Sequence, residues 1–386
     1  MSFEIDHERL MLGEEPGIRI TVVGLGRFGC DAVGSMAGKK LAGVEYVAVH
    51  TDPAALKESK APVRLCIGSG SASRGQSSEE ERKLIATQLQ GSNLIILVAG
   101  MGKGTGTSLA PVVALVARNM GILTIGIVTT PFALEGKAKA QSAAEGIASL
   151  KKYVDTLIVL DNEKVQAQSG EGTTVEQAFE RTGELVCGAV RGISGVLTER
   201  GLINIGFADF SELLSNAGEA AIGMASASGE GSAQRAMAEA FRNLGLPKDS
   251  AALLDGVLVG ITGSVAVKDL TRAMDYLQEQ VGADTAIVNG YNENSQEPGV
   301  AGATIIATGV GKARKPETPP AAPPRQAGWP VSLPGITNMG IRPPAYLKRD
   351  LLPEGMQGLP APASIPSRER IDKGRPETPA FQRILE

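Results

Sequence analysis

Short apolar runs alternate with amphipathic stretches along residues 18–161. The apolar runs predict strands at 18–24, 44–51, 62–68, 93–100, 122–130 and 155–161, and the amphipathic stretches predict helices at 29–37, 78–90, 109–120 and 137–152. Since the expected strands are apolar throughout rather than at every second position, they indicate a parallel sheet covered by helices on both faces. We therefore expect an α/β domain over residues 18–173.

A long helical pattern follows at 174–200, where Phe179, Val186, Val190 and Ile193 share an apolar stripe. A helix of this length is expected to link two domains. The segment 201–210 predicts a loop that turns into a short helix. Strands expected at 220–229, 256–263, 284–293 and 302–310, with helices at 233–244 and 267–280, then indicate a smaller α+β domain over residues 201–311.

The two ends of the chain differ in character from these domains. Residues 1–17 are polar and are expected to be poorly ordered. Residues 312–373 hold most of the 22 prolines and predict a disordered linker. In 374–386 the apolar residues regain helical spacing, which favours a short partner-binding tail over a featureless end.

Composition narrows the function classes. The net charge of −4 combines an acidic body with a mildly basic tail, so no nucleic-acid partner is expected. Two histidines, His7 and His50, make a Ser-His triad or a histidine metal site improbable, and no metal held by protein groups alone is expected. Three cysteines without metal-ligand spacing suit a reducing cytoplasm. No apolar run is long enough to insert into a membrane.

Two glycine-rich loops carry the candidate chemistry. The first, AGMGKGTGTS at 99–108, lies between an expected strand and helix, where backbone N–H groups and the helix N-terminus bind phosphates. The hydroxyls of Thr105 and Thr107 are expected to donate further hydrogen bonds. The second, GLGRFG at 24–29, fits a dinucleotide fingerprint, with Asp52 near the position of the ribose-binding acid. An NAD-dependent oxidoreductase is therefore an alternative, although two neighbouring loops favour a nucleoside triphosphate.

The chain resembles the FtsZ family of bacterial tubulin relatives over about residues 18–311. AGMGKGTGTSLAPVVA is similar to the tubulin/FtsZ signature, and EYVAVHTDPAALKESKAPVRLCIG, GLINIGFADF and ASGEGSAQRA follow in the family's order. PAFQR near the end looks like the family's tail motif. The resemblance implies a Rossmann-like GTPase domain, a long central helix, a smaller α+β domain and a disordered tail. It also implies GTP and GDP as ligands, Mg²⁺ with the nucleotide, and head-to-tail polymerisation.

The resemblance assigns roles residue by residue. The expected GTP-binding residues are Gly26, Arg27, Phe28, Gly29, Cys30, Asp31, Gly70, Ser71, Gly102, Lys103, Gly104, Thr105, Gly106, Thr107, Glu135, Lys139, Phe179 and Glu184. Among them, Glu135 matches a ribose-contacting carboxylate, Phe179 the aromatic that stacks on guanine, and Glu184 the acid that pairs with its edge. Asn204 and Asp209 match the catalytic loop that each subunit inserts over its neighbour's nucleotide. Pro379, Ala380, Phe381 and Arg383 match the partner-binding tail.

Three departures from the family pattern bear on mechanism. Gly206 replaces one of two loop carboxylates, which predicts hydrolysis slowed by about 10² or more. In the loop GLGRFG, Arg27 and Phe28 stand where the family has glycines, and shortly after it Asp31 replaces a base-contacting Asn. We therefore expect Arg27 to reach a phosphate and Asp31 to lie near Glu184. Lys103 replaces a signature glycine and is expected to substitute in part for magnesium.

The leading interpretation is a divergent, GTP-binding, filament-forming paralogue with weak hydrolysis, and a fully active GTPase of the division ring is the alternative. Expected partners are further copies of the chain, a second FtsZ, and membrane-tethering or regulatory division proteins that bind the tail. The expected location is the cytoplasm, at the division site or on another membrane-associated filament.

Overall fold

The computed structural model describes residues 17–38, 41, 43–68, 78–102, 104–167, 172–199, 201–247, 250–293 and 299–311, all within the first of two units, 1–323. Gly70, Ser71, Lys103, the expected linker 312–373 and the tail with Pro379, Ala380, Phe381 and Arg383 lie outside these residues. The expectations placed on them stay predictions.

A ten-stranded sheet runs through the described residues in the order β3-β2-β1-β4-β5-β6-β7-β10-β8-β9. Its first six strands are all parallel: β1 (Ile20–Leu25), β2 (Val44–His50), β3 (Val63–Cys66), β4 (Leu94–Gly100), β5 (Leu123–Thr129) and β6 (Thr156–Leu160). The order 3-2-1-4-5-6 is that of a Rossmann fold, whose ligands bind outside the carboxyl ends of the strands. The predicted doubly wound α/β fold is confirmed.

The remaining strands continue the same sheet. They are β7 (Gly218–Ser228), β8 (Gly256–Thr262), β9 (Ala286–Asn292) and β10 (Val300–Thr308). β7 pairs in parallel with β6 over only three residue pairs, and β10 lies antiparallel between β7 and β8. The predicted α+β arrangement of the second half is thus present, but it shares its sheet with the first half.

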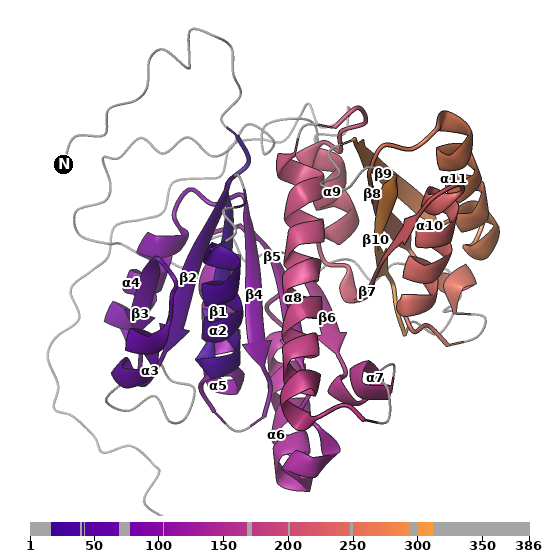
Figure 1. Ribbon diagram of the computed structural model, residues 1–386. Helices are drawn as coiled ribbons and strands as arrows, with labels where there is room; N and C mark the ends of the chain where they lie inside the picture. Colours follow the sequence, from indigo (N-terminus) through magenta and orange to yellow (C-terminus); the bar gives the residue numbers. More distant parts are fainter. Residues whose placement is uncertain are drawn as a thin grey trace, which may run out of the picture. The chain divides into compact units, whose positions relative to one another are not determined.

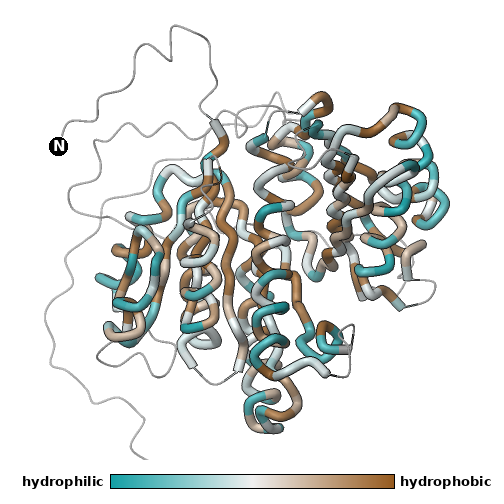
Figure 2. Tube along the Cα trace, viewed as in Figure 1, coloured by the Kyte–Doolittle hydropathy of each residue, from teal (hydrophilic) through white to brown (hydrophobic). Residues whose placement is uncertain are grey.

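Helices cover this sheet (Figure 1). They are α2 (Gly26–Ala37), α3 (Pro53–Glu58), α4 (Glu79–Leu89), α5 (Thr105–Asn119), α6 (Lys137–Leu150), α7 (Asn162–Ala167), α8 (Val175–Thr198), α9 (Phe207–Leu214), α10 (Ser232–Asn243) and α11 (Val267–Gln280), with 3₁₀ turns η2 (Ala133–Glu135) and η3 (Ala251–Leu253). On the face of the parallel sheet covered by α2 and α8, Val22 and Ile96 pack with Val190. On the other face, Leu97 packs with Val113 of α5. Figure 2 shows the hydrophobic residues concentrated along the strands.

Two helices begin earlier than the sequence predicts. α2 starts at Gly26 rather than residue 29, and α5 starts at Thr105 rather than residue 109, so both glycine-rich loops form first helical turns. Close packing explains the first case, because a Cβ on Gly29 would lie 2.4 Å from the Val98 carbonyl oxygen. Glycine here brings the first turn of α2 directly onto β4.

Two short helices, α3 and α7, were not predicted. The Asp52 carboxylate accepts a hydrogen bond from the Ala54 N–H at 2.8 Å, and Pro53 occupies the first position of α3. Asp-Pro is a standard helix start, so this signal was present in the sequence. Asp52, the candidate ribose-binding acid of the NAD alternative, is thus the N-cap of a helix.

α8 is the long helix that the sequence predicts. It spans 24 residues, or about 36 Å, and Thr174 with Gln177 forms a capping box at its start. Val186, Val190 and Ile193 of the predicted stripe are fully buried. Phe179, from the same stripe, is 39% exposed.

Candidate functional site

A cavity of about 1310 Å³ opens at the carboxyl ends of β4 and β5 and follows one side of α8. Twelve of the eighteen predicted GTP-binding residues line it: Gly26, Arg27, Phe28, Asp31, Gly102, Gly104, Thr105, Gly106, Glu135, Lys139, Phe179 and Glu184. Gly29, Cys30 and Thr107 are described but do not line it, and Gly70, Ser71 and Lys103 lie outside the described residues.

The two glycine-rich loops meet at one end of the cavity. A Cβ on Gly26 would lie 2.8 Å from the Gly106 nitrogen, and a Cβ on Gly106 would lie 2.7 Å from the Gly100 carbonyl oxygen. Gly104 has a φ of +154° and open space around it. The N-termini of α2 and α5 are therefore held together, and their N–H groups form a cradle suited to phosphate.

The hydroxyls of Thr105 and Thr107, in the signature loop at 99–108, both form hydrogen bonds within the protein. The Thr107 hydroxyl donates to the Gly102 carbonyl and accepts from the Gly102 N–H at 2.8 Å. The Thr105 hydroxyl shares a hydrogen bond of 2.8 Å with that of Thr51, which follows β2. Thr107 thus closes the loop, and Thr105 joins the loop to the neighbouring strand end.

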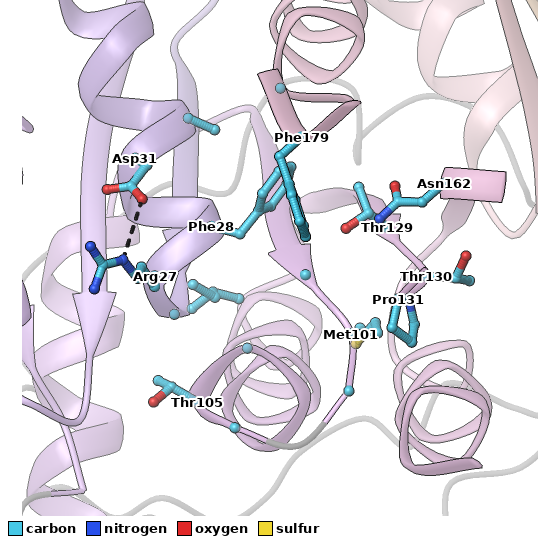
Figure 3. A pocket seen from close by; sticks show the side chains of 18 of the residues that line it. Arg27, Phe28, Asp31, Met101, Thr105, Thr129, Thr130, Pro131, Asn162 and Phe179 are labelled. Atoms are coloured by element: carbon cyan, nitrogen blue, oxygen red, sulfur yellow. Dashed lines mark ion pairs between the residues drawn. The ribbon is translucent and has the colours of Figure 1, made fainter. Parts of the chain in front are cut away.

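Charged side chains at the cavity pair with one another. Arg27 lies 3.9 Å from Asp31 and 4.0 Å from Glu58, and Figure 3 shows Arg27 directed at Asp31. Burial raises the pKa of the Asp31 carboxyl and Glu58 adds to the rise, while Arg27 and His50 oppose it. Arg27 is therefore directed at carboxylates here, and its expected reach to a phosphate would require it to leave them.

Lys139 and Glu135 form an ion pair within the first turns of η2 and α6. The aliphatic stem of Lys139 packs on the signature loop, because a Cβ on Gly102 would lie 2.9 Å from the Lys139 Cγ. Glu135 also accepts a hydrogen bond from the Phe132 N–H at 2.9 Å. The pair is thus fixed at the edge of the cradle.

Two aromatic rings line the cavity beyond the cradle. Phe179, in the second turn of α8, meets Phe132 edge-on, with ring centroids 4.8 Å apart. Phe28, from α2, also points into the cavity (Figure 3). Glu184, more than one turn after Phe179, is an exposed carboxylate on the same lining.

The predicted catalytic loop lies elsewhere. The Asn204 side chain accepts from the Gly201 N–H at 2.7 Å and donates to the Gly201 carbonyl at 3.0 Å, which closes the loop. Gly206 is the N-cap of α9, and Asp209 is an exposed acid in its first turn. None of these residues lines the cavity of the same chain.

Several lining residues were missed in the sequence. Thr129 ends β5, Thr130 and Pro131 follow it, and Asn162 follows β6. Their signal was positional, because the ends of parallel strands meet at one edge of a sheet. On α8, Glu180 and Arg191 line the cavity as well, at helical spacing from Glu184.

Membrane-spanning helices and clusters of metal-binding side chains are both absent from the residues that the structure describes. No helix among them is both long and apolar enough to cross a membrane. Within the same residues, no three His, Cys, Asp or Glu side chains are grouped closely enough to hold a metal ion.

Comparisons with known proteins agree with this geometry. Residues 19–170 match the model of the tubulin/FtsZ family, GTPase domain. The chain is 34% identical to the cell division protein FtsZ of Rickettsia felis, covering 78% of this chain and 70% of that protein, and 35% identical to its counterpart in Rickettsia bellii, covering 75% and 66%. A solved FtsZ dimer from M. jannaschii superposes with a TM-score of 0.71 at 29% identity, covering 80% of this chain and 93% of that one.

Proposed function

Since this chain belongs to the tubulin/FtsZ family, we propose that it binds GTP and GDP in the cavity, assembles head to tail, and hydrolyses GTP slowly because Gly206 replaces a carboxylate. The observation that carries the proposal is that no residue of the predicted catalytic loop, Asn204 to Asp209, lines the cavity of the same chain.

The separation of the loop from the cavity follows from helix geometry. Phe179, in the second turn of α8, lines the cavity, whereas Asn204 and Asp209 come after its last turn. From Phe179 to Thr198 the helix rises about 30 Å. Figure 1 shows α9 beside the end of α8 away from α6 and α7. The loop therefore lies beyond the end of α8, away from Phe179 and outside the cavity lining, which supports a nucleotide site completed by the loop of a second copy.

The cavity suits a guanine nucleotide in three respects. Its cradle offers N–H groups from two helix N-termini, its far end offers aromatic faces, and Glu184 offers an acceptor for guanine's N–H donors. Since no acidic cluster lies among the described residues, we expect the phosphates to supply most ligands of Mg²⁺. The bound ion would neutralise phosphate charge.

Weak hydrolysis is proposed from the loop itself. Positioning and electrostatics supply most of the catalysis in phosphoryl transfer. Glycine at 206 offers neither a charge nor an acceptor, which leaves Asp209 as the single loop acid at that pair of positions.

We further infer a cytoplasmic filament at or near the division site, because the relatives are cell division proteins. Co-assembly with a second FtsZ and binding of membrane-tethering or regulatory proteins to 374–386 belong to the same proposal.

Three measurements on the purified full chain test it. Mass spectrometry after denaturation identifies the bound nucleotide, and guanine nucleotide is expected rather than NAD. Sedimentation with GTP and with a non-hydrolysable analogue is expected to give polymer in both cases. Phosphate release, measured on the same samples, is expected at about one hundredth of an ordinary family rate or less. Phosphate release at the ordinary rate would refute weak hydrolysis, and absence of bound guanine nucleotide would refute the whole proposal.

A further inference from the structure

Phe28 is a bulky residue in a phosphate-binding loop, where space is most restricted. Gly100 at the end of β4 makes room for it. A Cβ at position 100 would lie 3.2 Å from the Phe28 Cβ and 3.5 Å from its Cγ, so the stem of the ring rests directly on the bare backbone of β4. The position of the Phe28 side chain is thus set by packing.

Phe28 and Phe179 differ in exposure from the aromatic residues of the core. Phe132 and Phe210 are at most 2% exposed, whereas Phe179 is 39% exposed and Phe28 is half-buried. Both partly exposed rings line the same cavity, from two different helices (Figure 3). Aromatic surface left in contact with water in a cavity is surface that a flat ligand would cover.

Phe28 does not fill this space. With its side chain in place the cavity still measures about 1310 Å³, above the range of about 300–1,000 Å³ that is usual for ligand sites. The ring is therefore part of the wall. Phe28 also follows Gly26 by two residues in the first turn of α2, and its ring points toward Phe179 (Figure 3).

We propose that Phe28 is a second base-stacking residue, and that the guanine ring of the bound nucleotide lies between the Phe28 ring of α2 and the Phe179 ring of α8. This inference rests on the proposed function, because it needs a guanine nucleotide in the cavity. A base held on both faces loses more water than a base stacked on one. The second ring also favours the larger purine ring system over pyrimidines.

The test measures GDP, CDP and pyrophosphate binding by calorimetry on the full chain and on Phe28→Ala. Removal of one aromatic–base stack is expected to weaken GDP binding about 10- to 100-fold. Pyrophosphate binding, which needs only the cradle, is expected to stay unchanged, and the preference for GDP over CDP is expected to fall. Phe28→Leu keeps the apolar bulk without the aromatic face and is expected to lose most of the same affinity.

A spectroscopic variant reports the contact itself. Trp329 is the chain's sole tryptophan, so Phe28→Trp in a Trp329→Phe background gives a single emission signal. We expect this variant to bind GDP with an affinity close to that of the unchanged chain. Bound GDP is expected to quench the tryptophan emission saturably. Phe241→Ala is the matched control, because Phe241 is also a partly buried aromatic but packs on Tyr276 of α11 at 6.5 Å between centroids. It is expected to bind GDP normally.

The outcomes separate the inference from the proposal beneath it. If the unchanged chain binds GDP but Phe28→Ala binds it equally well or more tightly, the second stack is refuted and the proposed function stands. Emission of Phe28→Trp that does not change at saturating GDP refutes the stack in the same way. If the unchanged chain binds pyrophosphate but no guanine nucleotide, both fail. Should Phe28→Ala not fold, Phe28→Leu and Phe28→Trp decide the question.

Discussion

Under the proposed weak hydrolysis, substitution of Gly206 by aspartate is expected to raise the rate of GTP hydrolysis. Gly206 has φ −66° and ψ 144°, an extended conformation that any residue adopts, and it is exposed. A Cβ at this position would meet the Asp209 Oδ2 at 3.4 Å, which is ordinary contact. Gly206→Asp therefore fits the loop without a change of backbone.

The effect on monomer stability is expected to be small, because two terms oppose each other. As N-cap of α9, aspartate is better than glycine by a few tenths of a kcal/mol. Repulsion from Asp209, three residues later, costs about 0.2–0.5 kcal/mol. The melting temperature of Gly206→Asp should therefore stay close to that of the unchanged chain, and a change in turnover is attributable to the loop's chemistry.

The expected gain in turnover is about 10²-fold, which corresponds to about 2.7 kcal/mol of transition-state stabilisation. Phosphate release is measured at several protein concentrations, because the loop is proposed to act on a neighbour's nucleotide. Gly206→Asn is the matched control, since it caps the helix equally well without adding a carboxylate. If Gly206→Asp folds, binds GTP and sediments as polymer but releases phosphate no faster than Gly206→Asn, the role assigned to position 206 is refuted.

Three further predictions concern single groups. Burial raises the pKa of the Asp31 carboxyl, so its ionised form costs stability above the folded pKa, whereas well below pH 3.8 the carboxyl is neutral in both the folded and the unfolded chain. Asp31→Asn is therefore expected to raise the melting temperature at pH 7 and much less at pH 3, and an equal change at both pH values would contradict this. Burial raises the pKa of the Cys30 thiol to about 11, so maleimide at pH 8 is expected to label the exposed Cys66 well before Cys30. Peptide mass mapping measures the labelling, and equal labelling of the two cysteines would contradict the prediction. Lys103→Ala is expected to weaken GTP binding at low Mg²⁺ and much less at high Mg²⁺, and titration at both concentrations checks this.

Much of the fold was predictable because continuous apolar runs in the sequence predict buried strands. The run Leu94–Gly100 has six buried residues and one half-buried residue, and it reads as a strand without tertiary information. The shared sheet was not predictable. β6 and β7 meet over three residue pairs only, and nothing in the local pattern of Gly218 or Glu219 specifies that pairing partner. The decisive contacts are long-range, whereas periodicity reports only local exposure.

The candidate site divides in the same way. The glycine content of the two loops predicts a phosphate-binding cradle. The direction of each threonine hydroxyl depends on neighbouring groups that the sequence does not reveal. Thr105 turns to Thr51 and Thr107 turns to Gly102 once the loop has folded. Arg27 likewise turns to Asp31, one helical turn ahead, a partner that i,i+4 spacing could have suggested.

The departures from the family pattern fall on two sides of the reaction, and their directions differ. In the loops proposed to bind the nucleotide, the sequence has Arg27, Phe28 and Lys103 where the family pattern has glycines. In the loop proposed to act on the neighbour's nucleotide, Gly206 stands where that pattern has a carboxylate. Groups that bind ground state and transition state alike strengthen binding without raising the rate of the chemical step. Loss of a group that acts only at the transition state lowers that rate. Under the proposed function, the two changes together favour a subunit interface that retains GTP and hydrolyses it slowly.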